Sequence, residues 1–345
     1  MHMLDDQQYI TRYDSEDALG FAAKQPEQLA YDFGVRSAHL KRPVTAVVWA
    51  GMGGSALAGE ILRTWPELPV PFILNKDYQL PAFAGESTLV ICASYSGNTE
   101  ETLSVLDEAE KRGCQIAVMA FGGKLLERAQ AAEYLLARIP HCPQPRAGVL
   151  YMYRAAVEIL LAARLIPAST LETLEKLISP LENATREWRA SVPQEDNRAK
   201  QLADDMAGKT PIIYAGPLMY PAAYKWKIDV NESGKNTAWC NTLPEFNHNE
   251  FIGWSSHPVE KPFAVIDLLS RFERPRILER FAVTDRLLSG MRPKAIEVEG
   301  MGESTIEQLL YLILLGDFAS TYLGILNGVN PTPVALVEKF KKELK

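Results

Sequence analysis

Ile91-Cys92-Ala93-Ser94-Tyr95-Ser96-Gly97-Asn98-Thr99-Glu100-Glu101-Thr102 places a hydroxyl-rich turn directly after an apolar run and directly before an amphipathic helical pattern. Open α/β sheets bind ligands beyond the carboxyl ends of their strands, where the next helix offers unpaired N–H groups and the positive end of its dipole. The hydroxyl donors would be Ser94, Ser96 and Thr99, and Gly97 lets the backbone approach a phosphate closely. A helix capped by Ser96 or Asn98 would have the same composition, so this stretch alone leaves both interpretations open.

A second turn of this kind occurs upstream, in Trp49-Ala50-Gly51-Met52-Gly53-Gly54-Ser55-Ala56. It too follows an apolar run and opens a helical pattern, so we expect both turns to meet in one crevice. A dinucleotide-binding fingerprint is the competing interpretation, since Ala56 stands where that motif needs its third small residue. However, no acidic residue for a ribose ends the next apolar run, Phe72-Ile73-Leu74-Asn75-Lys76, which disfavours a dinucleotide.

Apolar runs alternate with helical patterns along most of the chain, which predicts parallel sheets covered by helices. We predict an α/β fold with two such domains, because the alternation begins again near residue 211. The expected strands are 44–50, 70–74, 88–93, 115–119, 211–215, 263–268 and 295–298, and the expected longer helices are 149–165, 169–192, 219–230 and 306–326. The predicted parts are a helical arm (1–35), a first domain (36–165), a connecting helix (166–195) and a second domain with a C-terminal helix (196–345).

The net charge of this 345-residue chain limits the kinds of partner that it is expected to bind. It has 36 Lys and Arg against 43 Asp and Glu, a formal charge of -7, which argues against nucleic acid or an anionic membrane because both need a basic face. No apolar run is expected to reach the roughly 20 residues that span a bilayer, and the first residues lack the pattern of a signal peptide, so we expect a cytoplasmic protein. The four cysteines are far apart and indicate no disulfide framework.

Two polar clusters in the second half are candidates for acid and base chemistry. Glu232 ends a helical stretch rich in aromatic residues, and His248 lies in Pro244-Glu245-Phe246-Asn247-His248-Asn249-Glu250. A partly desolvated glutamate can have its pKa raised toward neutrality, which suits a base that takes a proton from carbon, and histidine suits proton transfer to a ring oxygen. Glu245 and Glu250 compete for the base role. The alternative is a helix-end carboxylate and a loop histidine with no catalytic part.

Arg146 lies on a proline-stiffened loop, Pro143-Gln144-Pro145-Arg146-Ala147-Gly148, before a helical pattern. A fixed guanidinium there could meet a phosphate or a developing oxyanion, although the spacing fits a surface arginine equally well. None of the five histidines belongs to an HExxH motif or a clear histidine–carboxylate metal pattern. We therefore expect a mechanism without metal or cofactor.

Taken together, these motifs resemble those of the bifunctional phosphoglucose/phosphomannose isomerases, which belong to the sugar isomerase (SIS) domain superfamily. The resemblance runs from about Asp32 to the C-terminus and is carried by the glycine-rich turn, the hydroxyl-rich turn, Asn231-Glu232 and residues 244–250 in this order. It implies two SIS domains and a homodimer with active sites at the subunit interface. It also implies isomerisation of glucose 6-phosphate, and of mannose 6-phosphate, to fructose 6-phosphate through a cis-enediol, an activity of glycolysis and gluconeogenesis.

The resemblance also implies roles for single residues. Those that would hold the sugar and its phosphate are Gly54, Ser55, Ser94, Ser96 and Thr99, with Gly53 shaping the turn. Glu232 matches the base that moves a proton between C2 and C1. His248 matches the ring-opening residue that the neighbouring subunit contributes, and Arg146 matches the group that stabilises the enediolate.

The C-terminal helix is implied to supply a lysine to the site. Lys341 fits best because it follows Phe340, where the family has a Leu-Lys pair, and Lys339 and Lys342 are the alternatives. Residues 330–334 offer no glutamine of the kind that conventional phosphoglucose isomerases place before their lysine. Dual-specificity members show this absence, and a smaller residue there leaves room for either C2 epimer.

Two other functions stay open at this point. A non-catalytic SIS regulator that binds a phosphosugar would need the two phosphate-binding turns but not Glu232, His248 and Arg146 together. The sequence shows no helix-turn-helix for DNA. An isomerase of another phosphosugar, such as an amino-sugar or a seven-carbon phosphate, would be marked by ammonia release or zinc dependence.

Overall fold

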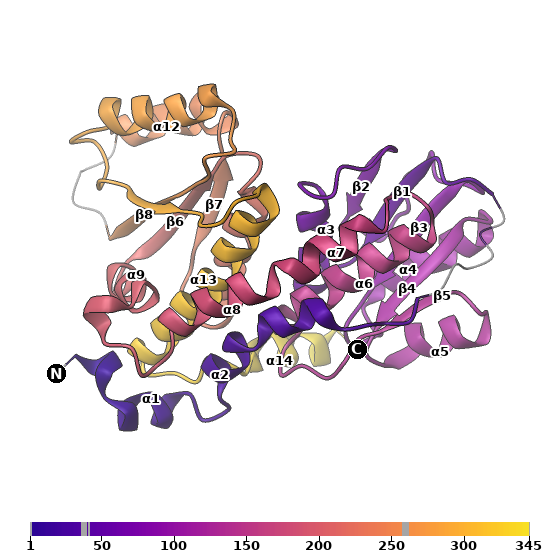
Figure 1. Ribbon diagram of the computed structural model, residues 1–345, viewed down its shortest axis with the longest axis horizontal. Helices are drawn as coiled ribbons and strands as arrows, with labels where there is room; N and C mark the ends of the chain where they lie inside the picture. Colours follow the sequence, from indigo (N-terminus) through magenta and orange to yellow (C-terminus); the bar gives the residue numbers. More distant parts are fainter. Residues whose placement is uncertain (1, 36–39, 41, 257–261, 345) are drawn as a thin grey trace. The chain divides into compact units, whose positions relative to one another are not determined.

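The computed structural model describes residues 2–35, 40, 42–256 and 262–344 (Figure 1). These residues form two compact units. One unit consists of Gln25–Ser179, and the other combines Met1–Lys24 with Pro180–Lys345. We call them the cradle unit and the C-terminal unit. The predicted helical arm, residues 1–35, therefore contributes residues to both.

The cradle unit is built on a five-stranded parallel sheet in the order β2-β1-β3-β4-β5. Helices α4 (Glu100–Lys111) and α5 (Gly123–Ala131) pack against one face of this sheet, and α3 (Gly54–Leu62) and α6 (Val149–Ala162) lie together on the other. The strands are β1 (Ala46–Ala50), β2 (Phe72–Asn75), β3 (Thr88–Ala93), β4 (Gln115–Ala120) and β5 (Leu135–Arg138). The predicted parallel sheet flanked by helices is confirmed for this half.

Burial explains which strands could be predicted. Every residue of β1, β3 and β4 is buried, because helices cover both faces of the central strands, and such strands appear in sequence as continuous apolar runs. The edge strand β5 is only partly buried and ends in the exposed Arg138. Its apolar run, Tyr134-Leu135-Leu136-Ala137, is only four residues long, and it was not among the predicted strands.

The C-terminal unit contains a four-stranded parallel sheet in the order β7-β6-β8-β9. Its strands are β6 (Thr210–Ala215), β7 (Trp239–Thr242), β8 (Phe263–Leu269) and β9 (Ile296–Glu299). Helix α12 (Pro275–Leu287) contributes to the core on one face, while α9 (Arg198–Met206) and α10 (Tyr220–Glu232) pack with the long helix α13 (Thr305–Leu326) on the other (Figure 1). The second predicted α/β domain is thus confirmed, and the polar edge strand β7 was missed.

Helix α13 corrects the expectation that no apolar run approaches membrane-spanning length. It has 22 residues and is long and apolar enough to cross a bilayer by length and composition, but 89% of its apolar window is buried inside the unit. Lys225 of α10 lies between Asp229 (2.6 Å) and Asp317 of α13 (2.5 Å), and Trp226 Nε1 donates to the Leu312 carbonyl at 2.7 Å. α13 is therefore the central core helix of its unit.

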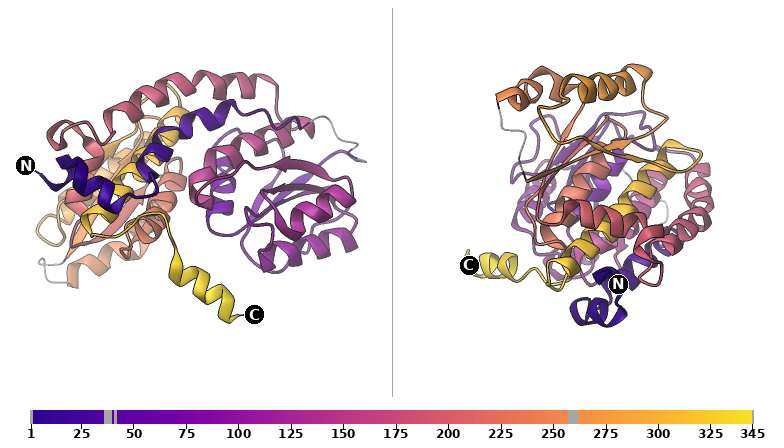
Figure 2. Two further views of the ribbon diagram at one scale, coloured as in Figure 1. Left: turned by 90° about the horizontal axis from the view of Figure 1, so that it is seen from below. Right: turned by 90° about the vertical axis from the view of Figure 1, so that its left-hand side faces the viewer.

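The helix predicted over 169–192 is divided into α7 (Ser169–Lys176) and α8 (Ile178–Glu187). Pro180 explains the division, because it falls in the first turn of α8 and has no N–H to donate to the preceding turn. The C-terminal helix α14 (Ala335–Glu343) is present as predicted. It buries no residue and projects from its own unit in both views of Figure 2.

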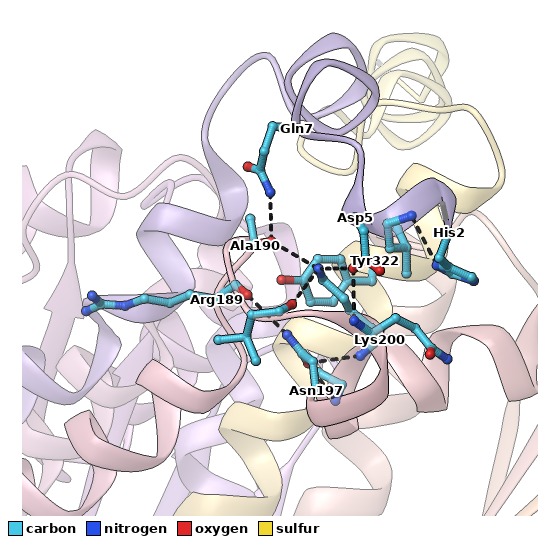
Figure 3. A network of polar contacts seen from close by, with 12 residues as sticks. His2, Asp5, Gln7, Arg189, Ala190, Asn197, Lys200 and Tyr322 are labelled. Carbon is cyan, nitrogen blue, oxygen red and sulfur yellow. Dashed lines mark hydrogen bonds and ion pairs between the residues drawn. The ribbon is translucent and has the colours of Figure 1, made fainter.

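The N-terminal residues are tied to the C-terminal unit by a buried lysine (Figure 3). Lys200 on α9 is fully buried, and its Nζ lies 3.0 Å from Asp5 Oδ1 and donates to the carbonyls of Ala190 (3.0 Å) and Val192 (2.7 Å). Asp5 belongs to the first of the N-terminal helices, which are η1 (Met3–Asp5), α1 (Gln7–Tyr13), α2 (Ala18–Ala23) and, in the cradle unit, η2 (Gln25–Ala30). The start of the chain is therefore a packed part of this unit rather than a free arm.

Candidate functional site

The two turns singled out in the sequence follow β1 and β3, which are neighbouring parallel strands. Both turns consequently lie at the carboxyl edge of the sheet, and a hydrogen bond joins them directly, from Tyr95 N to Ser55 Oγ at 3.0 Å. Ser55 and Ser94 are almost completely buried. The expected meeting of the two turns is a feature of the structure.

The hydroxyl groups of the second turn bond to one another. Ser94 Oγ and Thr99 Oγ1 are 2.8 Å apart, and Ser94 Oγ also accepts from Gly97 N at 3.1 Å. The helix cap proposed as an alternative at Ser96 or Asn98 is wrong, because Thr99 is the N-cap of α4 and makes no side-chain cap hydrogen bond. Ser96 Oγ instead accepts from Asn98 N at 3.3 Å, within the turn.

Helix α3 begins in the same way as α4. Gly53 is its N-cap, with φ +50°, and no side-chain cap hydrogen bond is present. Two neighbouring helix N-termini without side-chain caps therefore face the same sheet edge. First-turn N–H groups and the positive end of the helix dipole both favour an anion at such a place. We call this region, residues 51–55 and 94–99, the phosphate cradle.

Gly97 is required by a close backbone approach. Its φ is +69°, and a Cβ at this position would lie 1.7 Å from the carbonyl oxygen of Gly122. Gly122 belongs to the turn after β4, whose Phe121 N donates to the Tyr95 carbonyl at 3.0 Å and whose Leu125 N donates to the Gly97 carbonyl at 2.9 Å. A third turn thus supports the cradle from the side.

Arg146 lies next to the cradle, on the loop that enters α6. A Cβ at Gly54 would lie 2.8 Å from Arg146 N and 2.9 Å from the carbonyl carbon of Pro145, so only glycine allows α3 and this loop to approach so closely. The Arg146 side chain is buried. The structure therefore brings Arg146 together with the predicted binding residues, and the interpretation as an exposed surface arginine is wrong.

Two residues that the sequence analysis missed hold this loop. Gln28 donates from Nε2 to the Ala147 carbonyl at 2.9 Å and accepts from Tyr151 N at 3.0 Å, so one buried side chain spans the loop and the first turn of α6. Tyr95 Oη accepts from Cys142 N at 2.6 Å and donates to the Cys142 carbonyl at 2.9 Å. Burial raises the pKa of Tyr95, which keeps this donor protonated. The local sequence did not mark Gln28, which ends the polar stretch Lys24-Gln25-Pro26-Glu27-Gln28.

Glu232 and His248 both belong to the C-terminal unit, but its topology separates them. Glu232 is the last residue of α10, which returns from the carboxyl end of β6, so Glu232 lies toward the amino edge of the sheet. His248 ends the short helix η5 (Glu245–His248), which follows the carboxyl end of β7. A strand of four residues spans roughly 13 Å, so within one chain these residues are at opposite edges of the sheet.

The two glutamates that competed for the base role have other partners. Glu250 accepts from the Tyr214 hydroxyl at Oε1 and from Asn241 Nδ2 at Oε2, the latter at 2.7 Å. Glu245 is exposed and accepts from Asn249 Nδ2 at 2.6 Å. Both carboxylates are engaged in holding the loop that contains His248.

The C-terminal lysines lie on the exposed helix α14. Lys341 Nζ is 3.0 Å from Glu338 Oε1, and Lys339 Nζ is 3.8 Å from Glu343 Oε1, both within the helix. Leu336 and Phe340 on the same helix are also exposed. The assignment of Lys341 over Lys339 and Lys342 stays a prediction. Among the residues that the structure describes, no group of three or more His, Cys, Asp or Glu side chains is arranged to hold a metal ion.

Comparison with known proteins identifies the relatives of this chain. Residues 195–344 match the family model described as bacterial phospho-glucose isomerase C-terminal SIS domain. The bifunctional phosphoglucose/phosphomannose isomerase of Aquifex aeolicus is 33% identical over 306 residues, which cover 88% of this chain and 91% of that protein. The D-glucosamine-6-phosphate 4-epimerase of Sulfolobus acidocaldarius is 34% identical over 211 residues, which cover 61% of this chain and 64% of that protein.

The fold has counterparts among solved structures. A glucose-6-phosphate isomerase like protein from Thermus thermophilus superposes with a TM-score of 0.64 and 19% identity, covering 98% of this chain and 100% of that one. This likeness supports the fold alone. The sequence identity to the Aquifex enzyme over nearly the full length of both chains carries the assignment further, and the chain belongs to the family of bifunctional phosphoglucose/phosphomannose isomerases.

Proposed function

We propose that this protein interconverts glucose 6-phosphate and mannose 6-phosphate with fructose 6-phosphate, as a cytoplasmic homodimer. Family membership supports the reaction class. The observation that carries the proposal is the cradle itself, in which two uncapped helix N-termini meet at one sheet edge and are joined through Ser55 and Tyr95. A sugar phosphate supplies the dianion that such a site favours.

In this proposal the cradle binds the phosphate group and leaves the sugar carbons free to react. Gly54, Ser55, Ser94, Ser96 and Thr99 contact the substrate, and Gly53 gives the turn its shape. The hydroxyl groups of buried Ser94 and half-buried Thr99 are held in place before the ligand arrives, so less conformational entropy is lost on binding.

Catalysis then follows general acid–base steps. His248 protonates the ring oxygen as the C1–O5 bond breaks, and the C1 hydroxyl gives its proton to water, which leaves the open-chain aldose. Glu232 removes the proton from C2 while O1 gains a proton, which gives the cis-enediol. The C2 hydroxyl then loses its proton as Glu232 returns one to C1, so one proton has moved from O2 to O1 and the product is the ketose. Arg146 stabilises the negative charge that develops on the enediolate oxygens. Acceptance of both C2 epimers requires rotation about C2–C3, which exposes either face of C2 to Glu232.

The topology of the C-terminal unit supports a shared active site. Because Glu232 and His248 lie at opposite edges of one sheet, we infer that each site takes its histidine from the neighbouring subunit. We infer also that a lysine of α14, with Lys341 preferred, completes the site.

One assay tests the proposal. Purified protein is given glucose 6-phosphate, mannose 6-phosphate or glucosamine 6-phosphate in the presence of EDTA, and formation of fructose 6-phosphate and of ammonia is followed. The proposal expects fructose 6-phosphate from the first two substrates and no ammonia from the third. No turnover of any substrate would favour a phosphosugar-binding regulator, and loss of activity with EDTA would contradict a mechanism without metal.

The epimerase relative supports a second candidate substrate class. That relative is named for action on an amino-sugar phosphate. Glucosamine 6-phosphate is therefore also tested for inversion of configuration at C4 with the carbonyl group remaining at C1. The shorter match, 61% of this chain, makes this the weaker candidate.

A further inference from the structure

The segment that contains His248 is fixed at almost every position except the histidine. Phe246 is fully buried and packs against the Tyr214 ring, with centroids 4.6 Å apart. Asn247 donates from Nδ2 to Thr284 Oγ1 at 2.9 Å and accepts from Arg280 at 3.2 Å, so α12 holds it on both sides of its amide. The side chain of His248, next in the chain, is exposed.

The residues after His248 are held equally firmly. Asn249 bridges back to Glu245 at 2.6 Å, and its Oδ1 accepts from Glu250 N at 2.6 Å. Glu250 then uses both carboxylate oxygens, one for the hydroxyl of Tyr214 on β6 and one for Asn241 on β7. Two adjacent strands of the sheet therefore hold one carboxylate two residues away from the exposed imidazole.

Tyr214 is held by two further side chains. Trp254 Nε1 donates to its hydroxyl oxygen at 3.2 Å, and the guanidinium of Arg292 lies 5.8 Å from its ring centroid. Burial and the hydrogen bond to Glu250 raise the pKa of Tyr214, so its hydroxyl remains a donor to the carboxylate. The hydrogen bond thus has a fixed direction, from tyrosine to glutamate.

We propose that Glu250, held by Tyr214 and Asn241, is a positioning residue that fixes the turn carrying His248 for opening of the sugar ring. We call these three residues the loop clamp. The inference rests on the proposed function, because it needs His248 to act on a ring oxygen. A displacement of about 1 Å in a proton donor can lower a rate by roughly 100-fold, which is the size of effect that such a clamp prevents.

Anomer exchange separates positioning of His248 from a role in proton transfer at carbon. Interconversion of the α and β anomers of glucose 6-phosphate needs ring opening and closure but no proton transfer at C2. Glu232→Gln should therefore keep enzymatic anomer exchange while losing isomerisation. A base at Glu250 would show this same pattern, whereas a clamp residue should lose anomer exchange.

The experiment measures both reactions, by NMR exchange between anomers above the spontaneous rate and by formation of fructose 6-phosphate. Tyr214→Phe and Glu250→Gln are compared with the wild-type protein and with His248→Gln. We expect both clamp variants to lower anomer exchange and isomerisation together by about 10- to 100-fold, with KM changed less than about threefold because the cradle is untouched.

Tyr134→Phe is the matched control, because it removes another tyrosine–glutamate hydrogen bond, to Glu110 at 2.9 Å, in the cradle unit. It should leave both rates unchanged. Thermal unfolding is recorded for each variant. If Tyr214→Phe does not fold, Asn241→Ala removes the other half of the clamp from the edge strand β7 and is expected to show the same joint loss.

The outcomes distinguish the two proposals. A wild-type protein that converts no sugar phosphate would overturn the proposed function. An active wild-type protein whose folded clamp variants keep normal anomer exchange would overturn the clamp alone. Loss of isomerisation with retained anomer exchange in Glu250→Gln would replace positioning by direct proton transfer.

Discussion

The hydroxyl oxygen of Ser55 accepts a hydrogen bond from the backbone N–H of Tyr95 at 3.0 Å, and this contact makes the glycine-rich turn and the hydroxyl-rich turn one structure. The two residues are 40 positions apart in the chain, at the ends of neighbouring strands. Tyr95 also holds Cys142 through its hydroxyl, so the same residue connects the cradle to the loop that carries Arg146. The conformation of the cradle and the placement of Arg146 are therefore coupled.

Ser55→Ala should weaken substrate binding. The substitution removes a proposed substrate ligand and leaves the Tyr95 N–H without this acceptor, and loss of such a bond costs about 1–3 kcal/mol. We expect KM for glucose 6-phosphate to rise by about tenfold or more. Steady-state kinetics measure this, with Ser104→Ala on α4 as a control in the same unit. Equal KM values for both variants would show that the Ser55 hydroxyl has no part in binding.

Gly54→Ala should displace the Arg146 loop. The new methyl group would lie 2.8 Å from Arg146 N, which is backbone and cannot move aside without shifting the loop. We expect kcat to fall by about 10- to 100-fold, because a misplaced group in the active site loses most of its effect on the transition state. Gly85→Ala is the control, since apart from its two chain neighbours no residue has an atom within 4 Å of its Cβ position. A Gly54→Ala enzyme with full activity would separate Arg146 from the proposed chemistry.

Gln28→Leu tests whether the N-terminal region positions Arg146. Leucine keeps much of the side-chain volume but removes the hydrogen bonds to Ala147 and Tyr151. We expect a loss of about 1–3 kcal/mol in stability and a decrease in kcat larger than any change in KM. Gln7→Leu, which removes an exposed hydrogen bond to the Ala190 carbonyl in the C-terminal unit (Figure 3), should leave kcat unchanged. The reverse pattern would contradict a positioning role for Gln28.

The parts of this structure that could be predicted from the sequence are those with a local signal. β3 and β4 are buried on both faces and therefore appear as apolar runs, and the turn after β3 has the composition of an anion site. The edge strands β5 and β7 have only short apolar runs, of four and three residues. Gln28 gave no signal because its partners, Ala147 and Tyr151, are more than 100 residues away, and nothing in the local sequence specifies a long-range hydrogen bond.

The N-cap of α4 shows a second limit of prediction from the local sequence. Ser96 and Asn98 are typical N-cap residues, and the local pattern left a cap at either of them open. The helix begins one residue later, because Gly97 is drawn against Gly122 and the Thr99 hydroxyl bonds to Ser94 instead of the helix. Tertiary contacts thus exclude a cap at Ser96 or Asn98, which the local sequence could not do.

Glu232→Gln should abolish nearly all turnover and leave substrate binding measurable. The amide has almost the same shape as the carboxylate but cannot accept the C2 proton, and general base steps are typically worth about 10²–10⁴-fold. Isomerisation and solvent deuterium incorporation at C2 report the loss. Glu299→Gln is the control because Glu299 is an exposed glutamate on β9 of the same unit. Full loss in Glu245→Gln with activity kept in Glu232→Gln would reassign the base.

Asp267, a buried acid of the C-terminal unit, gives a prediction for stability. Asp267 lies on β8 and is almost completely buried, with Arg292 at 3.9 Å as its ion-pair partner. Burial raises the pKa of Asp267 to about 7, and the positive charge of Arg292, 3.9 Å away, offsets this increase only in part. The native state therefore keeps a proton on Asp267 over a pH range in which the unfolded chain has lost it.

The sign of the resulting pH dependence follows from proton linkage. Between pH 3.8 and about 7 the folded state binds more protons at this site than the unfolded state does, so rising pH destabilises the fold by roughly 1.4 kcal/mol per unit. The destabilisation is absent below this range and complete above it. Asp267→Asn cannot lose a proton, so its free energy of unfolding should decrease less than that of the wild type between about pH 4.5 and 7.5. Urea unfolding followed by tryptophan fluorescence measures the difference, with the exposed Asp196→Asn as control. Parallel pH profiles for wild type and Asp267→Asn would mean that Asp267 is ionised throughout and that Arg292 compensates its burial fully.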